Sequence, residues 1–200
     1  AAAGLGKPVL VETDLYKEDA VDRLVAAATK ALGRIDILMN AAGGSRVVPF
    51  EAPIEKWKES MLLNFERLRE LTHAVVPAMK QNGFGRVINI TGSSEPRGIN
   101  AANPAKAAVH AWAKGLSREV AKHGITVNCI QPGRIISEQI VRMYPTEESR
   151  KEFSQREIPV GRFGEAKELA VLTIFLASPL AGYITGTVIP VDGGMSHFAF

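Results

Sequence analysis

Short apolar runs recur along this 200-residue chain, and longer helical patterns separate them. Consecutive apolar positions within the runs indicate strands that are buried on both faces. Such strands, alternating with helices, are typical of a parallel sheet covered on both sides, so we expect an α/β fold. The predicted strands are Val9–Val11, Ile35–Met39, Val87–Thr91, Ile125–Ile130 and Thr187–Val191.

Four segments between the strands have the apolar spacing of amphipathic helices. The first follows Tyr16 and ends at Gly33, and the second follows Pro53, a residue suited to a first helical turn, over residues 54–81. The third covers about residues 103–122 and the fourth Lys167–Ala177. Because the sequence contains no repeat, low-complexity segment or linker, we predict one domain over residues 1–200.

Composition excludes several classes of protein. The 24 basic and 21 acidic residues are scattered, and the net charge of +3 forms no block that would indicate a nucleic-acid or membrane partner. Cys129 is the only cysteine, which excludes an internal disulfide and a cysteine-based metal site. No stretch is long and apolar enough to span a membrane, and the start AAAGLGKPVL lacks the features of a signal peptide. We therefore expect a cytoplasmic protein.

The segment from Arg86 to Lys106, RVINITGSSEPRGINAANPAK, holds the densest group of candidate site residues. It is predicted to form a buried strand, a polar turn and the start of a helix that carries Lys106. An isolated helical lysine is usually solvated, but the apolar context PAKAAVHAW favours a function for Lys106.

With the motifs around it, this segment resembles the short-chain dehydrogenase/reductase family, and the resemblance covers essentially the whole chain. Asp14-Leu15 and Asn40-Ala41-Ala42-Gly43 follow the first two predicted strands, Asn64 lies in LLNFERL, and Pro132-Gly133-Arg134-Ile135-Ile136-Ser137 follows the strand at 125–130. The resemblance implies a Rossmann-like doubly wound parallel sheet and an NAD(P)-dependent oxidoreductase that acts on a small alcohol or ketone.

The resemblance also implies which residues contact the cofactor, either NAD or NADP, and the substrate. The lid-like segment RMYPTEES places Met143 and Tyr144 against the substrate, and an alternative is that Tyr144 swings into the site. The implied cofactor-binding residues are Asp14, Leu15, Asn40, Ala41, Ala42, Gly43, Lys106, Pro132, Gly133, Ile135 and Ser137.

Two departures from the family pattern limit the functional interpretation. The sequence contains no G-x-x-x-G-x-G, and AAAGLGKPVLVETD corresponds to the end of the family's second helix and its third strand. We expect that roughly the first βαβα portion, about 50 residues, is missing from this sequence. We also expect that the sequence alone binds a dinucleotide poorly, and that the natural protein continues upstream of Ala1.

The second departure is chemical. The family places a catalytic tyrosine four residues before its lysine, where this sequence has Ala102. Lys106 and Asn64 match the family's catalytic lysine and asparagine, whereas Gly92 occupies the usual serine position and Ser93 or Ser94 takes the serine's role. Pro104 favours a helix that begins near Asn103, which would leave Ala102 outside the first turn.

Several residues have a second interpretation. Glu95 is either an exposed loop carboxylate or, if burial raises its pKa, the replacement proton donor. Asn64 could serve only to join neighbouring backbone, Asp14 to cap the next helix, and the serines to form a turn. His110 is expected to be a packed or interface histidine.

Two functions follow from these observations. One is an oxidoreductase in which Ser93 or Ser94, together with Glu95 or water, supplies the proton. The other is a catalytically inactive relative that binds a nucleotide or ligand or acts in assembly. The helices at 54–81 and 103–122 carry apolar residues on more than one face, for example Val75, Val76 and Val109, so we predict a homo-oligomer, either a dimer or a tetramer.

Overall fold

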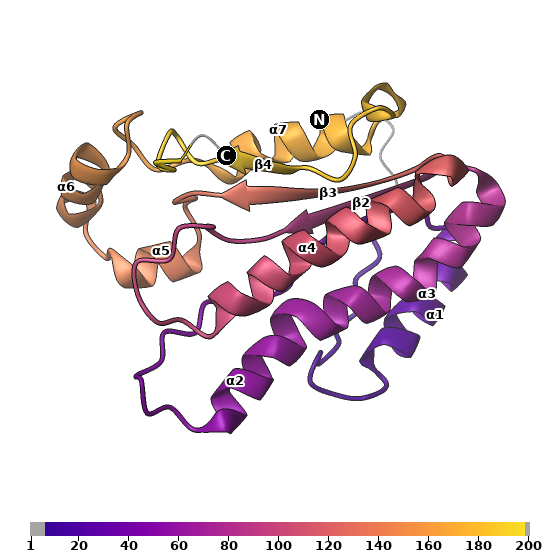
Figure 1. Ribbon diagram of the computed structural model, residues 1–200, viewed down its shortest axis with the longest axis horizontal. Coiled ribbons are helices and arrows are strands. Elements are labelled where there is room, and N and C mark those ends of the chain that lie inside the picture. Colours follow the sequence, from indigo (N-terminus) through magenta and orange to yellow (C-terminus); the bar gives the residue numbers. More distant parts are fainter. Residues whose placement is uncertain (1–6, 199–200) are drawn as a thin grey trace.

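The computed structural model describes residues 7–198, and its centre is a parallel sheet of four strands (Figure 1). The strands are β1 (Ile37–Asn40), β2 (Gly85–Ile90), β3 (Ile125–Pro132) and β4 (Val188–Val191), in the order β1-β2-β3-β4. All three neighbouring pairs are parallel. The predicted α/β fold is confirmed.

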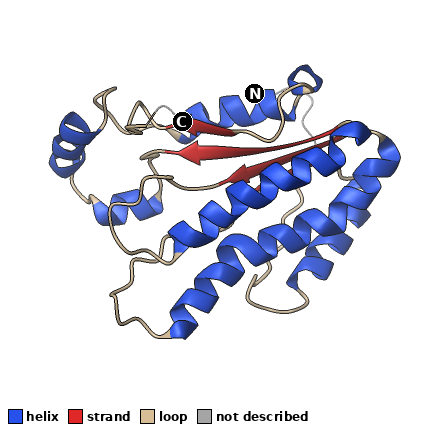
Figure 2. Cartoon of the chain, viewed as in Figure 1, coloured by secondary structure: helices blue, strands red, loops and turns tan. Residues whose placement is uncertain are grey.

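Helices cover both faces of this sheet, as Figure 2 shows. Val87 and Val127 pack toward α3 (Arg67–Asn82) and α4 (Ala102–Val120), which share one hydrophobic cluster with them. Ile88 and Ile130 pack on the opposite face against Leu176 of α7 (Ala166–Ala177). Strand residues therefore alternate between two apolar layers, which explains why the strands carry apolar residues at consecutive positions.

The remaining helices are short or lie at the ends of the sheet. Helix α1 (Ala20–Leu32) packs on α3, and α5 (Glu138–Met143) and α6 (Glu147–Glu157) follow β3. Two 3-10 turns, Ala121–His123 and Pro179–Ala181, follow α4 and α7. Gly124 ends the first of these turns at φ 72°, and a Cβ there would lie 2.3 Å from the Gly83 carbonyl oxygen. Only glycine fits that position.

The predicted helix over residues 54–81 contains a break in its hydrogen-bond register. It consists of α2 (Ile54–Met61), a π-helical turn (Leu62–Glu66) and α3. Asn64 lies in the π turn, and its side-chain Nδ2 donates to the carbonyl oxygen of Ser60, four residues earlier, at 2.9 Å. A side chain that takes this acceptor displaces the ordinary i→i−4 bond, which accounts for the local change of register.

The predicted strand Val9–Val11 is wrong. These residues lie outside any strand, and their side chains are 61%, 90% and 39% exposed. Within residues 7–198, β1 is bonded only to β2, so no strand lies beside residues 9–11 to accept their backbone hydrogen bonds. An isolated strand would leave those groups unpaired.

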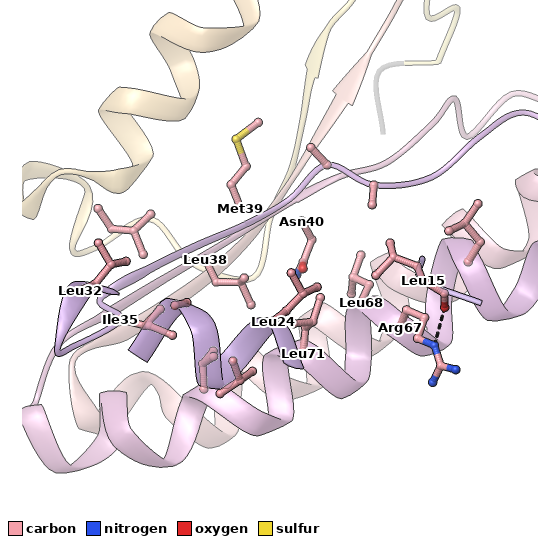
Figure 3. A pocket seen from close by; sticks show the side chains of 17 residues that line it. Leu15, Leu24, Leu32, Ile35, Leu38, Met39, Asn40, Arg67, Leu68 and Leu71 are labelled. Atoms are coloured by element: carbon pink, nitrogen blue, oxygen red, sulfur yellow. Dashed lines mark hydrogen bonds between the residues drawn. The ribbon is translucent and has the colours of Figure 1, made fainter. Parts of the chain in front are cut away.

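An apolar cavity of about 300 Å³ extends along the outer side of β1, between α1 and α3 (Figure 3). Leu15 and Arg67 lie at one end of it and Leu32 and Ile35 at the other. Its walls are almost entirely aliphatic. The lining residues are Leu15, Leu24, Val25, Ala28, Leu32, Ile35, Ile37, Leu38, Met39, Asn40, Ala41, Ala42, Leu63, Arg67, Leu68, Leu71 and Val75.

The apolar residues that suggested an oligomer do not support that prediction. Val75, Val76 and Val109 are at most 6% exposed and belong to the core of this chain. Exposed apolar side chains lie instead on α7, where Val171 and Ile174 are 69% and 70% exposed. No helix in residues 7–198 is long and apolar enough to cross a membrane.

Candidate active site

The predicted site residues gather at the carboxyl ends of the strands. Asn40 ends β1 and residues 41–43 follow it, residues 91–95 follow β2, and Pro132 ends β3 and residues 133–137 follow it. Because these strands are parallel, the three segments emerge at the same edge of the sheet. In open α/β sheets this edge is where ligands bind.

Lys106, Asn64 and Gly43 meet in one place at this edge. A Cβ on Gly43 would lie 2.7 Å from Asn64 Oδ1 and 2.9 Å from Lys106 Nζ. Gly43 also has φ 153°, a conformation that side chains disfavour. The glycine therefore lets the loop after β1 approach both polar side chains.

Asn64 is fully buried and bonded to backbone on both sides of its amide. Its Oδ1 accepts from the Gly44 amide at 3.0 Å, and its Nδ2 donates to the Gly44 carbonyl oxygen at 3.3 Å. The structure thus shows the backbone-joining role that was one of its two interpretations. Asn64 Oδ1 and Lys106 Nζ both border the space beside Gly43, and a catalytic role for Asn64 stays a prediction.

Lys106 is largely shielded from solvent, and its Nζ donates to the Ile90 carbonyl oxygen at 3.0 Å. Desolvation lowers the pKa of Lys106. One turn later, His110 Nε2 lies 2.7 Å from Thr91 Oγ1, which donates in turn to the Ile130 carbonyl oxygen. Burial, and then the charge of Lys106, lower the pKa of His110. This histidine is packed within the chain, which is one of its two expected positions.

The expectation that Ala102 lies outside the helix is wrong. Ala102 is the first residue of α4 and is 6% exposed. Asn100 explains the earlier start, because its side-chain Oδ1 accepts the Ala102 amide at 2.9 Å. The same oxygen accepts the Arg46 amide at 3.1 Å, and Asn100 Nδ2 donates to Ser45 Oγ at 2.7 Å. Asn100 therefore joins the start of α4 to the loop after β1.

The two candidate serines differ in their contacts. Ser93 Oγ accepts the Glu95 amide at 3.0 Å, which is a turn-forming contact. Ser94 Oγ donates to Gln131 Oε1 at 2.8 Å, at the end of β3. Both serines are exposed, and the choice between them as carbonyl polariser stays open.

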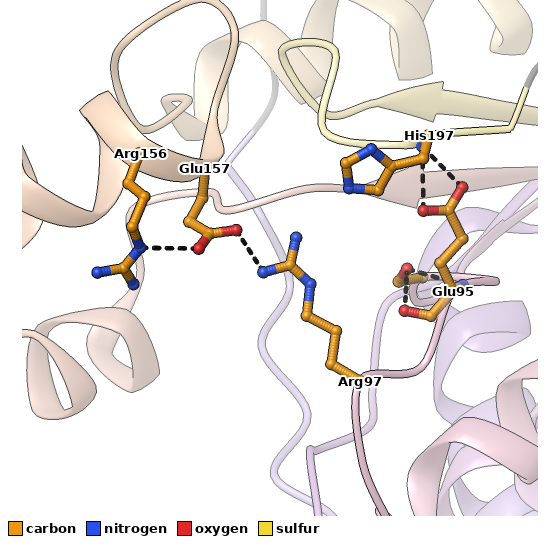
Figure 4. Close-up of polar contacts among 6 residues, drawn as sticks. Glu95, Arg97, Arg156, Glu157 and His197 are labelled. Carbon is orange, nitrogen blue, oxygen red and sulfur yellow. Dashed lines mark hydrogen bonds and ion pairs between the residues drawn. The ribbon is translucent and has the colours of Figure 1, made fainter.

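The hypothesis that burial raises the pKa of Glu95 is wrong. Its carboxylate accepts the backbone amide of His197, at 2.9 and 3.0 Å (Figure 4). It also accepts the amide of Phe198, at 3.0 Å. These hydrogen bonds stabilise the charged form and lower the pKa of Glu95. Glu95 is thus an ionised anchor, poorly suited to donate a proton.

The turn after β3 is fixed by contacts with neighbouring segments. A Cβ on Gly133 would lie 2.6 Å from the Asp192 Cα, so the neighbouring segment requires glycine there. Ile135 forms a bridge with Gly164, and Ser137 Oγ caps α5 by accepting the Ile140 amide at 3.3 Å. Their contacts with a cofactor stay predictions.

Asp14 and Leu15, which were predicted to contact the cofactor, lie on the loop before α1. Asp14 Oδ1 accepts the Tyr16 amide at 2.9 Å, and α1 begins only at Ala20, so the helix-capping interpretation of Asp14 is wrong. The Leu15 carbonyl oxygen accepts Arg67 Nε at 2.8 Å, and Leu15 lines the apolar cavity.

The two predicted substrate residues have unlike surroundings. The Tyr144 ring packs against Phe153 and Phe163, with centroid distances of 4.9 and 5.6 Å. Swinging Tyr144 into the site would break both contacts. Met143 is 48% exposed.

Sequence reasoning missed three polar residues around the site, Asn100, Gln131 and Ser196. An asparagine just before a helix signals a cap, and this signal could have identified Asn100. Gln131 and Ser196 belong to contacts between distant segments, with Gln131 Nε2 3.5 Å from Ser196 Oγ. The residues next to Gln131 and Ser196 in the sequence do not predict such contacts.

Comparison with known proteins gives a consistent result. Residues 1–196 match the sequence model of the family described as enoyl-(acyl carrier protein) reductase. The chain is 36% identical over 188 residues to 2,3-dihydroxy-2,3-dihydro-p-cumate dehydrogenase of Pseudomonas putida, covering 90% of this chain and 71% of that protein. It is 38% identical over 199 residues to acetoacetyl-CoA reductase of Shinella zoogloeoides, covering 94% and 82%.

Solved structures also resemble the chain. YwfH, described as an NADPH-dependent reductase involved in bacilysin biosynthesis, superposes with a TM-score of 0.85 at 30% identity, over 92% of this chain and 76% of that one. A 7α-hydroxysteroid dehydrogenase complexed with NADH and 7-oxo glycochenodeoxycholic acid gives 0.83 at 28% identity, over 94% and 74%.

Proposed function

Since the chain belongs to the short-chain dehydrogenase/reductase family, we propose that it is an NAD(P)-dependent oxidoreductase acting on a small alcohol or ketone. The observation that carries the proposal is the meeting of Lys106 Nζ, Asn64 Oδ1 and the glycine loop after β1 at the ligand-binding edge of the sheet. Relatives described as dehydrogenases and reductases support the same class of reaction.

The residues at this edge fit the ribose and nicotinamide part of such a cofactor. Among the described residues Lys106 donates one hydrogen bond, to Ile90, which leaves further donors of its ammonium for ribose hydroxyls. Ala41, Ala42 and Gly43 are small enough to let a ligand approach the backbone. The bound cofactor would supply the hydride, and Lys106 would hold and orient its ribose.

The proton route must differ from that of a tyrosine-bearing relative. Glu95 is held ionised by two backbone amides, so we propose that water, positioned by the hydroxyl of Ser93 or Ser94, exchanges the proton with the substrate oxygen. Such a proton transfer requires the donor to lie within hydrogen-bond distance of the substrate oxygen. A water molecule bound to an exposed serine hydroxyl can meet this requirement.

The test is a hydride-transfer assay on the protein in its full natural length. NADH and NADPH are each supplied with a panel of ketones, and oxidation of the reduced nicotinamide is followed by absorbance. We expect turnover of at least one ketone and its loss in Lys106→Ala. Lys122→Ala removes an exposed lysine beyond the end of α4 and should keep full activity.

Two results would contradict the proposal. One is equal turnover in Lys106→Ala and the unmodified protein. The other is saturable NAD(P)H binding without hydride transfer to any member of the panel, which would instead support the catalytically inactive, ligand-binding relative.

A further inference from the structure

The loop between β2 and α4, residues 91–101, has firmly held ends and an irregular middle. At its start, a Cβ on Gly92 would lie 3.8 Å from Lys106 Cγ, so this end borders the site. At its end, Asn100 is bonded to residues 45 and 46. Residues 93 and 94 and 96–99 are exposed and form neither helix nor strand. The contacts of a few side chains therefore decide how the middle of the loop lies.

Two of these contacts bind the loop to the C-terminal segment, residues 192–198. The direct one is the Glu95 carboxylate, which accepts both the His197 and the Phe198 amide. The indirect one runs from Ser94 Oγ to Gln131, whose Nε2 lies 3.5 Å from Ser196 Oγ. Asp192 Oδ2 then accepts Ser196 Oγ at 2.6 Å and fixes the turn of the segment.

A third contact joins the loop to α6. Arg97 forms an ion pair with Glu157 at the end of α6, and Arg156 Nε donates to the same carboxylate at 2.8 Å (Figure 4). In Figure 4 Glu95 contacts His197 of the C-terminal segment, whereas Arg97 of the same loop contacts Glu157. The loop is thus bonded to two separate segments.

We propose that Glu95 is a positioning residue that holds the C-terminal segment against the loop and thereby sets the placement of Ser93 and Ser94 beside the reacting carbonyl. This inference rests on the proposed function, because it concerns the same site. A carboxylate that accepts successive backbone amides forms charge-assisted bonds, which are stronger than neutral ones. An amide side chain at this position keeps the shape but loses the charge and one acceptor oxygen.

The first test does not depend on activity. Hydrogen exchange is measured by mass spectrometry in peptides covering residues 91–101 and 192–200 of Glu95→Gln, with the exposed Glu119→Gln on α4 as control. Since hydrogen bonds to charged groups contribute enough for a change of about tenfold in an equilibrium, we expect exchange about tenfold faster in both peptides of Glu95→Gln. Faster exchange in the C-terminal peptide alone would overturn the inference.

The second test separates positioning from general stability. In Glu95→Gln we expect kcat for the ketone to fall between about tenfold and a hundredfold, the scale of a small misplacement of reacting groups. The dissociation constant of NAD(P)H should stay unchanged, because among the described residues neither Lys106 nor Asn64 is hydrogen-bonded to Glu95 or to the C-terminal segment. Unchanged kcat, or equal losses in kcat and cofactor affinity, would contradict a positioning role.

A chain ending at Ser196 supplies a second variant. It removes the amides that Glu95 binds, so it should reproduce the kinetic effect of Glu95→Gln. Combining both changes should give no further loss of kcat, because both changes break the same contact between Glu95 and the C-terminal segment. Additive losses would overturn the inference. Absence of turnover in the unmodified protein would count against the proposed function, and the exchange experiment would still decide whether Glu95 holds the loop.

Discussion

Residue 102 is the position at which we expect this chain to depart from its family, because it holds alanine where the resemblance implies a tyrosine. The structure puts Ala102 in the first turn of α4, one turn before Lys106. Side chains four residues apart on a helix lie on the same face. A tyrosine at this position would therefore extend from the face that carries the lysine.

We predict that Ala102→Tyr increases the rate of ketone reduction, because the hydroxyl would supply a proton donor close to Lys106. Ala102→Phe is the matched control, since it adds the ring without the hydroxyl. Initial rates with saturating NAD(P)H compare the two. Equal rates in both variants would contradict the prediction. They would show that the loop, held by the hydrogen bonds of Asn100, keeps a tyrosine hydroxyl at residue 102 away from the substrate oxygen.

The immediate neighbours of single residues also explain why the site needs glycine at two positions and why Glu95 is ionised. Gly43 and Gly133 are required because neighbouring groups occupy the space of a Cβ. Glu95 shows the limit of reasoning from residue type, because a carboxylate next to two serines suggested an acid. Its pKa is lowered by amides about 100 positions later in the chain, which the local sequence does not reveal.

At the scale of elements, α6 is attached to the loop after β2 through one carboxylate. Hydrogen bonds from Arg156 and then Arg97 lower the pKa of Glu157 to about 2. A carboxylate whose pKa is lower in the folded than in the unfolded state stabilises the fold above its ordinary pKa, and that contribution is lost as the pH falls toward the folded value.

We therefore predict that Glu157→Gln lowers the thermal midpoint at neutral pH by a small amount. The difference from the unmodified protein should shrink below the ordinary glutamate pKa of 4.5 and disappear as the pH falls through the folded value of about 2. Thermal unfolding followed by circular dichroism across this range provides the measurement. Glu152→Gln, on the same helix with its carboxylate 4.0 Å from Arg156 and 81% exposed, should show little pH-dependent difference. A difference for Glu157→Gln that does not change with pH would refute the prediction.

The helices also show which element boundaries the sequence determines. Apolar spacing predicted α1, α4 and α7 to within a few residues, and it predicted both outer ends of the segment from α2 to α3, because each helix must bury one apolar face. The π turn at Asn64 was not predicted. It depends on a side-chain amide that bonds both to its own helix and to Gly44, on a different segment.

At the scale of the whole molecule, apolar surface remains uncovered on α7. Val171 and Ile174 are both more than two-thirds exposed, and Phe175 beside them is 42% exposed. Contiguous exposed apolar surface often marks an interaction site.

We predict that the protein is a homo-oligomer and that this face of α7 contributes to the contact. Multi-angle light scattering should give more than the monomer mass, and Ile174→Glu should shift the distribution toward monomer. Val141→Glu introduces the same charge at a 46% exposed position on α5 and should leave the mass unchanged. A monomer mass for the unmodified protein would contradict the prediction.

By itself, the sequence determined the parallel α/β architecture, its four strands and the helices α1, α4 and α7, and it indicated Lys106, Asn64 and the glycine loops as candidate site residues. These features follow from apolar periodicity and from motifs in which neighbouring residues act together. Only the tertiary structure decided that Val9–Val11 forms no strand, that Ala102 begins α4 and that Glu95 holds the C-terminal segment. Strand pairing, capping by Asn100 and the charge state of Glu95 all depend on groups distant in sequence, and folding alone brings those groups within hydrogen-bond distance.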